Sequence, residues 1–382
     1  MELWGLDENF QQVKYMPYLS RQWKRRYYEC GQFSLQIMAR DYDPAVKYLW
    51  TPERPEMAMV QKVQTDEQIK GKFVQLSGFF LEKVLDRQIT FPDIKGDYTL
   101  NSLAELFLTK SWYKPDVYDI QLGDVPEDPV SVVWESKLLG QSMYETLKTL
   151  EMSHRITYDG DAFTYSVYQG LDRTQTQNTN AFALFSEDSP HVAELTYTED
   201  ETDYKNVAMV MYGSNDAGDP YREDVYREGW EQEGRRWLLV RSGGETRDEA
   251  IQNGKEELNK YNRIENAKVK TIQNADGLLY LRDYDLGDKC DIVSHTYAHS
   301  LEARIVSIDE VEERGQTKIT LGFGEGEKTT YQKNDALCGH RPPRAQGGIT
   351  CSDSRLTLRL PARMRPGFPF TTGRAIPSSW PR

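Results

Sequence analysis

The sequence predicts an α+β protein in which β-strands dominate. Short segments alternate apolar and polar residues with a period of two, turn residues separate them, and helical periodicity is confined to a few stretches. In residues 33–37, for example, Phe, Leu and Ile alternate with Ser and Gln, and Gly31 supplies the backbone freedom of a tight turn. Residues 23–35 (WKRRYYECGQFSL) are therefore expected to form a β-hairpin.

The first 90 residues are expected to form five or six short strands of a barrel or a sandwich. The polar run 64–70 is expected to be a loop. Asp43 and Pro44 favour a short helix over 43–49, because they suit its cap and first turn. The strands are expected within 2–6 (with the extended run that follows it), 18–28, 32–38, 57–63 and 73–76.

The middle of the chain is expected to form a small α+β unit. Residues 100–110 and 142–153 have helical spacing of apolar residues, and Asn101 or Ser102 can cap the first helix. A strand is expected over 130–134. A hairpin over 156–168 is expected to turn at Asp-Gly.

The C-terminal part is β-rich again, with one long helix over 246–261 whose charges suit a solvated face. A turn at Leu286-Gly287-Asp288 is expected to lead into the strand 289–294. The other strands are expected at 181–185, 192–198, 206–212, 221–227, 236–240, 267–272, 278–282, 303–311 and 317–321.

Length and composition limit the possible classes. A chain of 382 residues is too long for a single ordinary core and suggests two or three domains. No run approaches the eighteen apolar residues of a membrane span, and the opening MELWGLDENF is not a secretory signal. The four Cys form no CxxC pair, so neither a disulfide framework nor a zinc site is expected, and we expect a protein made in a cytoplasm.

Charge divides the chain at Cys338. The segment 338–382 holds eight Arg, one Asp, seven of the 17 Pro and no Lys or Glu, so residues 1–337 carry 39 basic (47 − 8) and 59 acidic (60 − 1) side chains, a formal charge of −20. Such an acidic body is unsuited to gripping nucleic-acid phosphates. The basic tail is either a product of a shifted reading frame, a flexible tail or a nucleic-acid arm.

Two groups of candidate chemical residues involve histidine. His295 and His299 have the i, i+4 spacing of a helical metal site, but in an extended segment they would lie about 13 Å apart, and surface histidines are expected. Cys30 and His154 could form a thiol–imidazole pair, yet no nucleophile motif surrounds Cys30, and a cysteine in a hairpin turn is expected.

The remaining candidates are expected to be loops and turns. The acidic run 199–203 lacks the spacing of a calcium loop, and Asp159-Gly160-Asp161 suits a turn. The glycine-rich segment 322–326 opens no helix of a phosphate loop. No pair among the 60 acidic residues is singled out as a glycosidase site. We therefore predict no catalytic, cofactor-binding or metal-binding residue, and no enzyme.

The order of several motifs resembles one family. From Met1 to Gly326 the chain is similar to the Gp37-like tail proteins of siphophages and prophages, which are hub proteins related to the myophage baseplate hub and to the N-terminal part of tail-associated lysins. The motifs that carry the resemblance are MELWGLDENF, WKRRYYECGQFSL, VQLSGFFLEKVLDRQI (74–89), the helix before Tyr261, YDLGDKCDIV (284–293) and ARIVSIDEVEERGQTKITLGFG (303–324). The tail after Cys338 departs from the family pattern.

This resemblance implies two tube-like β-barrel domains, at 1–97 and 176–330, the second with a long helix. A small α+β domain is expected between them at 98–175, and 338–382 is expected to be an atypical basic, Pro/Arg-rich tail that is disordered or out of frame. The resemblance also implies a homotrimeric hub of the tail tip or baseplate. This hub would continue the tail tube and form the DNA exit channel, without sequence-specific DNA binding. The implied neighbours are the distal tail protein, the tape measure protein and a fibre or receptor-binding protein. The implied location is the virion tail tip, assembled in the bacterial cytoplasm.

Two alternatives from other classes remain. One is a tail-associated cell-wall hydrolase, although little more than 50 residues follow Gly326, too few for the separate catalytic domain of such lysins. The other is a receptor- or glycan-binding module that uses the aromatic residues around Trp112-Tyr113 and 221–237.

Overall fold

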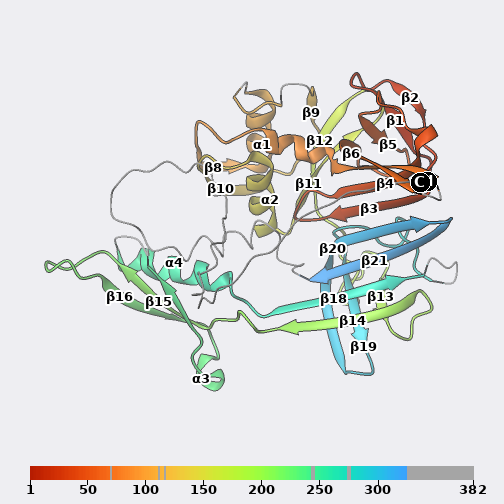
Figure 1. Cartoon of the computed structure of the whole chain (residues 1–382). Helices are drawn as coiled ribbons and strands as arrows, with labels where there is room; N and C mark the ends of the chain where they lie inside the picture. Colours follow the sequence, from red (N-terminus) through yellow and green to blue (C-terminus); the bar gives the residue numbers. More distant parts are fainter. Residues whose placement is uncertain (69–70, 111, 116–117, 242–245, 273–276, 325–382) are drawn as a thin grey trace, which may run out of the picture. The chain divides into compact units, whose positions relative to one another are not determined.

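Antiparallel β-strands dominate the computed structural model of the chain (Figure 1). It confirms the β-dominated α+β class. All described residues belong to the compact unit Met1–Glu327, and the tail from Cys338 lies outside them, so its three interpretations stay open. The structure describes residues 1–324 except 69–70, 111, 116–117, 242–245 and 273–276.

Most strands from the two ends of the chain join one 13-stranded sheet, whose main path runs β14-β18-β21-β20-β3-β4-β7-β6-β5-β1-β2, with β19 paired to β20 and β13 to β19. This path has two free ends, and among the described residues it closes into no barrel. The N-terminal members are β1 (Trp4–Leu6), β2 (Gln12–Tyr15), β3 (Ser20–Arg26), β4 (Gln32–Met38), β5 (Tyr48–Trp50), β6 (Ala58–Gln68) and β7 (Gly71–Phe80). The C-terminal members are β13 (Leu184–Ser186), β14 (Val192–Asp200), β18 (Ile264–Thr271), β19 (Lys289–Ser294), β20 (His299–Glu313) and β21 (Gln316–Gly324).

The predicted hairpin of residues 23–35 is present as β3 and β4. Phe33, Leu35 and Ile37 are buried, while the residues between them face the other side of the sheet. Trp23, opposite Phe33 in the strand register, is also fully buried and packs against the ring of Phe80. The period-two alternation therefore places one face of the hairpin in a core, as expected.

Three predicted elements are wrong. Residues 43–49 form a turn and then β5 instead of a helix, because the Asp43 carboxylate accepts a hydrogen bond from the backbone of Ala45 and β5 pairs with both β1 and β6. The predicted loop 64–70 is strand as far as Gln68, and residues 69–70 lie outside the described ones. Residues 64–67 are polar because this end of β6 is exposed and packs against no core.

The third wrong element is the strand predicted over 278–282. These residues form a turn in which the backbone N–H of Leu279 donates to the Asp283 carboxylate and that of Leu281 to the carbonyl of Tyr284. Leu281 has a positive φ of 67°. Tyr280 and Tyr284 are buried at this turn and Leu278 packs against the same core, whereas Leu281 is 40% exposed.

The α+β unit packs around an apolar core to which both helices contribute and which also includes Leu6, Tyr48, Met57 and Met59 of the N-terminal part. Thr99 caps the first helix and forms a reciprocal capping box with Ser102, so the predicted cap at Asn101 or Ser102 is corrected. The hairpin turning at Asp159-Gly160 is confirmed. The elements are the 3₁₀ helix η2 (Leu81–Arg87), β8 (Ile94–Thr99), α1 (Leu100–Thr109), β9 (Ile120–Leu122), β10 (Pro129–Trp134), α2 (Leu139–Thr149), β11 (Ser153–Tyr158) and β12 (Phe163–Tyr168).

A small lobe, residues 201–263, separates β14 from β18, which pair with each other. In it the helix α4 covers one face of a three-stranded sheet of order β16-β15-β17 (Figure 1). The predicted long helix is confirmed as α4, with Thr246 as its cap. The elements of the lobe are β15 (Val207–Tyr212), β16 (Tyr221–Tyr226), α3 (Trp230–Glu233), β17 (Trp237–Val240) and α4 (Arg247–Asn259).

Candidate functional site

The hairpin strand β3 joins the two β-rich parts of the chain. It pairs with β4 on one side and with β20 on the other, and the β20 pairing runs from Ser307↔Arg26 to Glu313↔Ser20. Strands nearly 300 residues apart in the sequence therefore lie side by side (Figure 1). We call the charged side chains around this pairing the ionic junction: Arg21, Arg25, Arg54, Glu56, Asp285, Glu310 and Glu312.

Arg25 forms one half of the ionic junction and is only 2% exposed. Its Nε donates to Glu56 at 2.6 Å, and its Nη1 donates to the Tyr280 hydroxyl at 2.9 Å and to the carboxylate of Asp285. Burial opposes the charge of Arg25, but Glu56 and the other acidic partners hold its pKa well above the usual value. A buried charge is tolerated only when it is paired in this way.

Glu310 forms the other half and is also 2% exposed. It binds Arg21 directly and Arg54 at 2.9 Å, and Glu312 takes a second bond from Arg21 at 3.1 Å. Burial tends to raise the pKa of Glu310, but Arg21 and Arg54 outweigh it and lower the pKa.

The ionic junction was not predicted, although the sequence carries a signal for it. Arg21 and Arg25 occupy the same inward-facing phase of β3 as the buried Trp23. Glu310 likewise falls in the inward phase of β20, after the buried Ile308. Charges in the apolar phase of alternating strands indicate buried ion pairs, although they do not show which residues meet.

The predicted turn at Gly287 is confirmed, and it connects the hairpin with the α+β unit. Gly287 has a φ of +94°, and a Cβ there would lie 2.4 Å from the ring of Tyr27. The Tyr27 hydroxyl donates to the carbonyl of Glu151 at 3.0 Å. The Asp288 carboxylate accepts from the backbone of Leu171 at 2.8 Å and from Arg173 at 2.6 Å.

Part of the face of β3, β4 and β7 opposite their core carries uncharged polar side chains, whereas Lys24 and Arg26 lie farther along the same face of β3. Ser20, Gln36 and Gln75 lie in one cross-strand row, and Gln22, Ser34 and Ser77 in the next. All six are partly exposed. We call these two rows the polar face, and none of its six side chains is charged.

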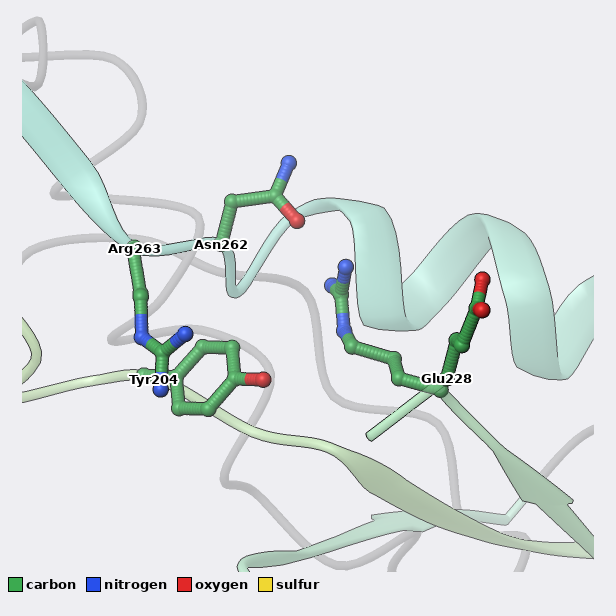
Figure 2. A pocket seen from close by; sticks show the side chains of 5 residues that line it. Tyr204, Glu228, Asn262 and Arg263 are labelled. Atoms are coloured by element: carbon green, nitrogen blue, oxygen red, sulfur yellow. The ribbon is translucent and has the colours of Figure 1, made fainter. Parts of the chain in front are cut away.

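The lobe holds an open hollow of about 510 Å³. Figure 2 shows the Arg263 side chain against the Tyr204 ring, and the guanidinium carbon lies 4.6 Å from the ring centroid. Arg263 also pairs with Glu201 and Glu233, each at 2.6 Å. Because these charges satisfy one another, we interpret the hollow as part of the lobe's attachment and not as a ligand site. Its lining residues are Tyr204, Arg227, Glu228, Asn262 and Arg263.

Cys30 and His154 do not form a thiol–imidazole pair, because each contacts other groups. Cys30 lies between β3 and β4, and its Sγ contacts the carbonyls of Gly31 and Phe80. Burial raises its pKa well above the usual range, which is the opposite of what a nucleophile needs. The ring of His154 packs 4.1 Å from that of Tyr144, and burial lowers its pKa to about 3.

The other candidate residues lie apart from one another. His295 and His299 are exposed at the tip of the β19–β20 hairpin, where His299 stacks on Tyr197. In the acidic run 199–203, Glu201 is engaged by Arg236 and Arg263.

The two glycine-containing candidates are a turn and part of a strand. Asp159 accepts hydrogen bonds from the backbone of Asp161 and Ala162, as in a turn. Gly322 and Gly324 belong to β21, and residues 325–326 of that segment lie outside the described ones.

The described residues contain neither a metal-ion cluster nor a membrane-spanning helix. No group of three or more His, Cys, Asp and Glu side chains is arranged to hold a metal ion. No helix in the described ranges is long and apolar enough to cross a membrane.

Comparisons with known proteins identify the class. Residues 116–325 match the family described as Siphovirus ReqiPepy6 Gp37-like protein, which is more than half of the chain. No curated protein matches the sequence.

Several solved structures share the fold at low sequence identity. A tail protein from Neisseria meningitidis MC58 is 11% identical, with 85% of this chain and 95% of that chain covered and a TM-score of 0.58. The 43 kDa tail protein of prophage MuSo2 from Shewanella oneidensis is 13% identical, with 85% and 98% covered and a TM-score of 0.57. The prophage tail protein gp18 from Listeria monocytogenes EGD-e is 12% identical, with 89% and 99% covered and a TM-score of 0.51.

The chain therefore has the fold of a phage tail structural protein. It belongs to the siphovirus ReqiPepy6 Gp37-like family, as the order of its motifs predicts.

Proposed function

We propose that the protein is a subunit of a homotrimeric hub at the tail tip or baseplate of a phage, which continues the tail tube and encloses the DNA exit channel. Its role is architectural, and we propose no catalytic activity. The observation that carries this proposal is the large sheet, in which strands of both β-rich parts are joined through β3 and β20. Such a subunit offers two sets of strands to one ring.

The edges of this sheet support assembly with other chains. β5 pairs with β6 only at Ala58 and Met59, so beyond Val60 the outer edge of β6 meets no strand of the described part. β14 likewise pairs on one side only, with β18. Unpaired edges of this length are normally covered, and pairing with neighbouring subunits would cover them.

The polar face supports the channel. Its six Ser and Gln side chains are uncharged, and Gln75 donates a hydrogen bond to Ser34. DNA phosphates are gripped by clusters of Lys and Arg. Two rows of amides and hydroxyls on an acidic body give a passing polyanion few places to bind, and Arg26, farther along the same face, is paired with Asp309 at 2.6 Å.

The domain organisation and the neighbours belong to the same proposal. Residues 1–97 and 176–330 would each supply tube-forming strands, and 98–175 would lie between them as the α+β unit. The open edges and the tail location imply contacts with the distal tail protein, the tape measure protein and a fibre or receptor-binding protein.

The mass of the purified full-length protein tests the proposal. Native mass spectrometry is expected to give three times the 44.2 kDa chain mass, and negative-stain electron microscopy is expected to show rings with a central opening. A monomer at all concentrations would contradict the hub. A monomer that also cleared peptidoglycan in a turbidity assay would favour the hydrolase alternative.

A further inference from the structure

One face of the lobe's three-stranded sheet is apolar and partly exposed in the described part of the chain, although Val207 on this face is fully buried. α4 packs on the face that holds Val210 and Val225. On the opposite face Tyr226, Val207 and Trp237 form one cross-strand row, and Met209 and Leu239 lie in the next. Trp237 is 40% exposed and Leu239 48%.

The composition of this face is that of a protein interface. Arg222 lies over the ring of Trp237 at 5.7 Å, Trp230 packs against Tyr226, and Arg235 lies over Trp230 at 4.9 Å. Trp, Tyr, Met and Arg are the residues enriched where proteins bind one another. Arg222 and Arg235 carry two positive charges and Asp224 one negative charge, so this face has a formal charge of +1. The body of the chain, in contrast, is strongly acidic. We call it the Trp237 patch: Met209, Arg222, Tyr226, Trp230, Trp237 and Leu239, with Asp224 and Arg235 at its rim.

A second exposed apolar surface lies on the α+β unit with the opposite charge. Phe91 is 70% exposed, and Val133, on the outer face of β10, is 63% exposed. The surrounding charges are Asp93, Asp97 and Glu135 against Lys95, a formal charge of −2. Lys95 bonds Glu135 at 2.6 Å and Asp93 at 3.5 Å, so these groups gather at one place. We call it the Phe91 patch: Ile89, Phe91, Asp93, Asp97, Val133 and Glu135.

We infer that the Trp237 patch binds the Phe91 patch of the neighbouring copy of this chain. Each patch has an apolar centre, and their rims carry opposite charge. Because the two patches differ, the contact is head-to-tail, and it closes the proposed trimer when each copy is rotated by about 120° from the last. The inference rests on the proposed trimer and names the surfaces that hold it together.

Cysteine cross-linking of the full-length protein tests the contact. In a C338S/C351S background, the L239C/V133C double variant is expected to form a covalent trimer with a flexible bismaleimide, whereas L239C alone and V133C alone are expected to remain monomeric on a denaturing gel. Cys30 and Cys290 have raised pKa values because they are buried, so they leave the background low.

A charge variant provides an independent measurement. L239D places a carboxylate at the centre of the contact, facing an acidic rim, and is expected to weaken trimer assembly about 30-fold or more in analytical ultracentrifugation. Y297D is the matched control, because Tyr297 is 73% exposed at the β19–β20 tip outside both patches, and it is expected to leave the trimer unchanged. Circular dichroism shows whether each variant is folded.

The outcomes separate this inference from the hub proposal. A wild-type trimer that yields no L239C/V133C cross-link and keeps its mass in L239D overturns the inference and leaves the hub intact. The same result together with loss of binding to another tail protein assigns the Trp237 patch to that protein and also overturns the inference. A wild-type monomer overturns both.

Discussion

Replacing Arg25 with methionine removes the guanidinium that pairs with Glu56 inside the ionic junction. Methionine fills most of the same space, so the main change is electrostatic. Arg25 is 2% exposed and Glu56 is 7% exposed, and the variant leaves the Glu56 carboxylate buried without its 2.6 Å partner. Breaking a buried ion pair from one side costs about 3–5 kcal/mol. The second carboxylate, Asp285, is 40% exposed, so its pairing adds at most about 1 kcal/mol.

We therefore expect R25M to lower the free energy of unfolding by about 3–5 kcal/mol. Urea denaturation followed by tryptophan fluorescence at pH 7.5 measures this loss. In the double variant R25M/E56Q the unpaired charge is absent, and about half of the loss is expected to return.

A matched surface pair serves as the control. Lys72 and Glu67 lie 2.8 Å apart but are 68% and 72% exposed, so K72A is expected to change the stability by no more than about 0.5 kcal/mol. A loss in R25M as small as that in K72A would refute the reasoning. So would a double variant no more stable than R25M alone.

Two further predictions concern single residues. G287A is expected to destabilise the protein by about 2–4 kcal/mol in a thermal melt, because residue 287 has a φ of +94° and its Cβ would also meet the Tyr27 ring. G160A is the control: its φ is +111° but its Cβ would point into open space, so it is expected to cost about 1 kcal/mol. Equal losses in the two variants would show that the contact with Tyr27 is unimportant. Burial raises the pKa of Glu82 from 4.5 to about 7. Between these pH values only the unfolded chain releases the Glu82 proton, so the stability contributed by this group falls as pH rises, by about 3 kcal/mol in all. E82Q is expected to gain stability relative to the wild type between pH 4.5 and 7.5 in urea denaturation, and a constant difference across that range would contradict the assignment.

Features that depend on neighbouring residues could be predicted from the sequence. The alternation of Phe33, Leu35 and Ile37 is sufficient to predict a strand with one buried face, because the period of a strand is a local property. The helix capped by Thr246 was also predictable, since cap and helical spacing lie within a few turns of each other. The order of motifs along the chain was sufficient to predict the family.

The errors have a common physical origin. Residues 43–49 carry helix-starting residues, yet pairing with β1 and β6 satisfies the backbone of β5. The polar end of β6 looked like a loop, because polarity reports exposure and not backbone conformation. In both cases a contact from elsewhere in the chain outweighed the local preference.

The sequence by itself determined the β-dominated class, the hairpin around Gly31, the turn at Gly287 and the absence of a recognisable catalytic motif. Only the tertiary structure decided that β3 pairs with β20, that Arg21 meets Glu310 across 289 residues of sequence, and which sheet edges and apolar faces stay open. The reason is that alternation specifies which side of a strand is buried, whereas the partner of a strand or a buried charge depends on distant segments that the local pattern does not encode.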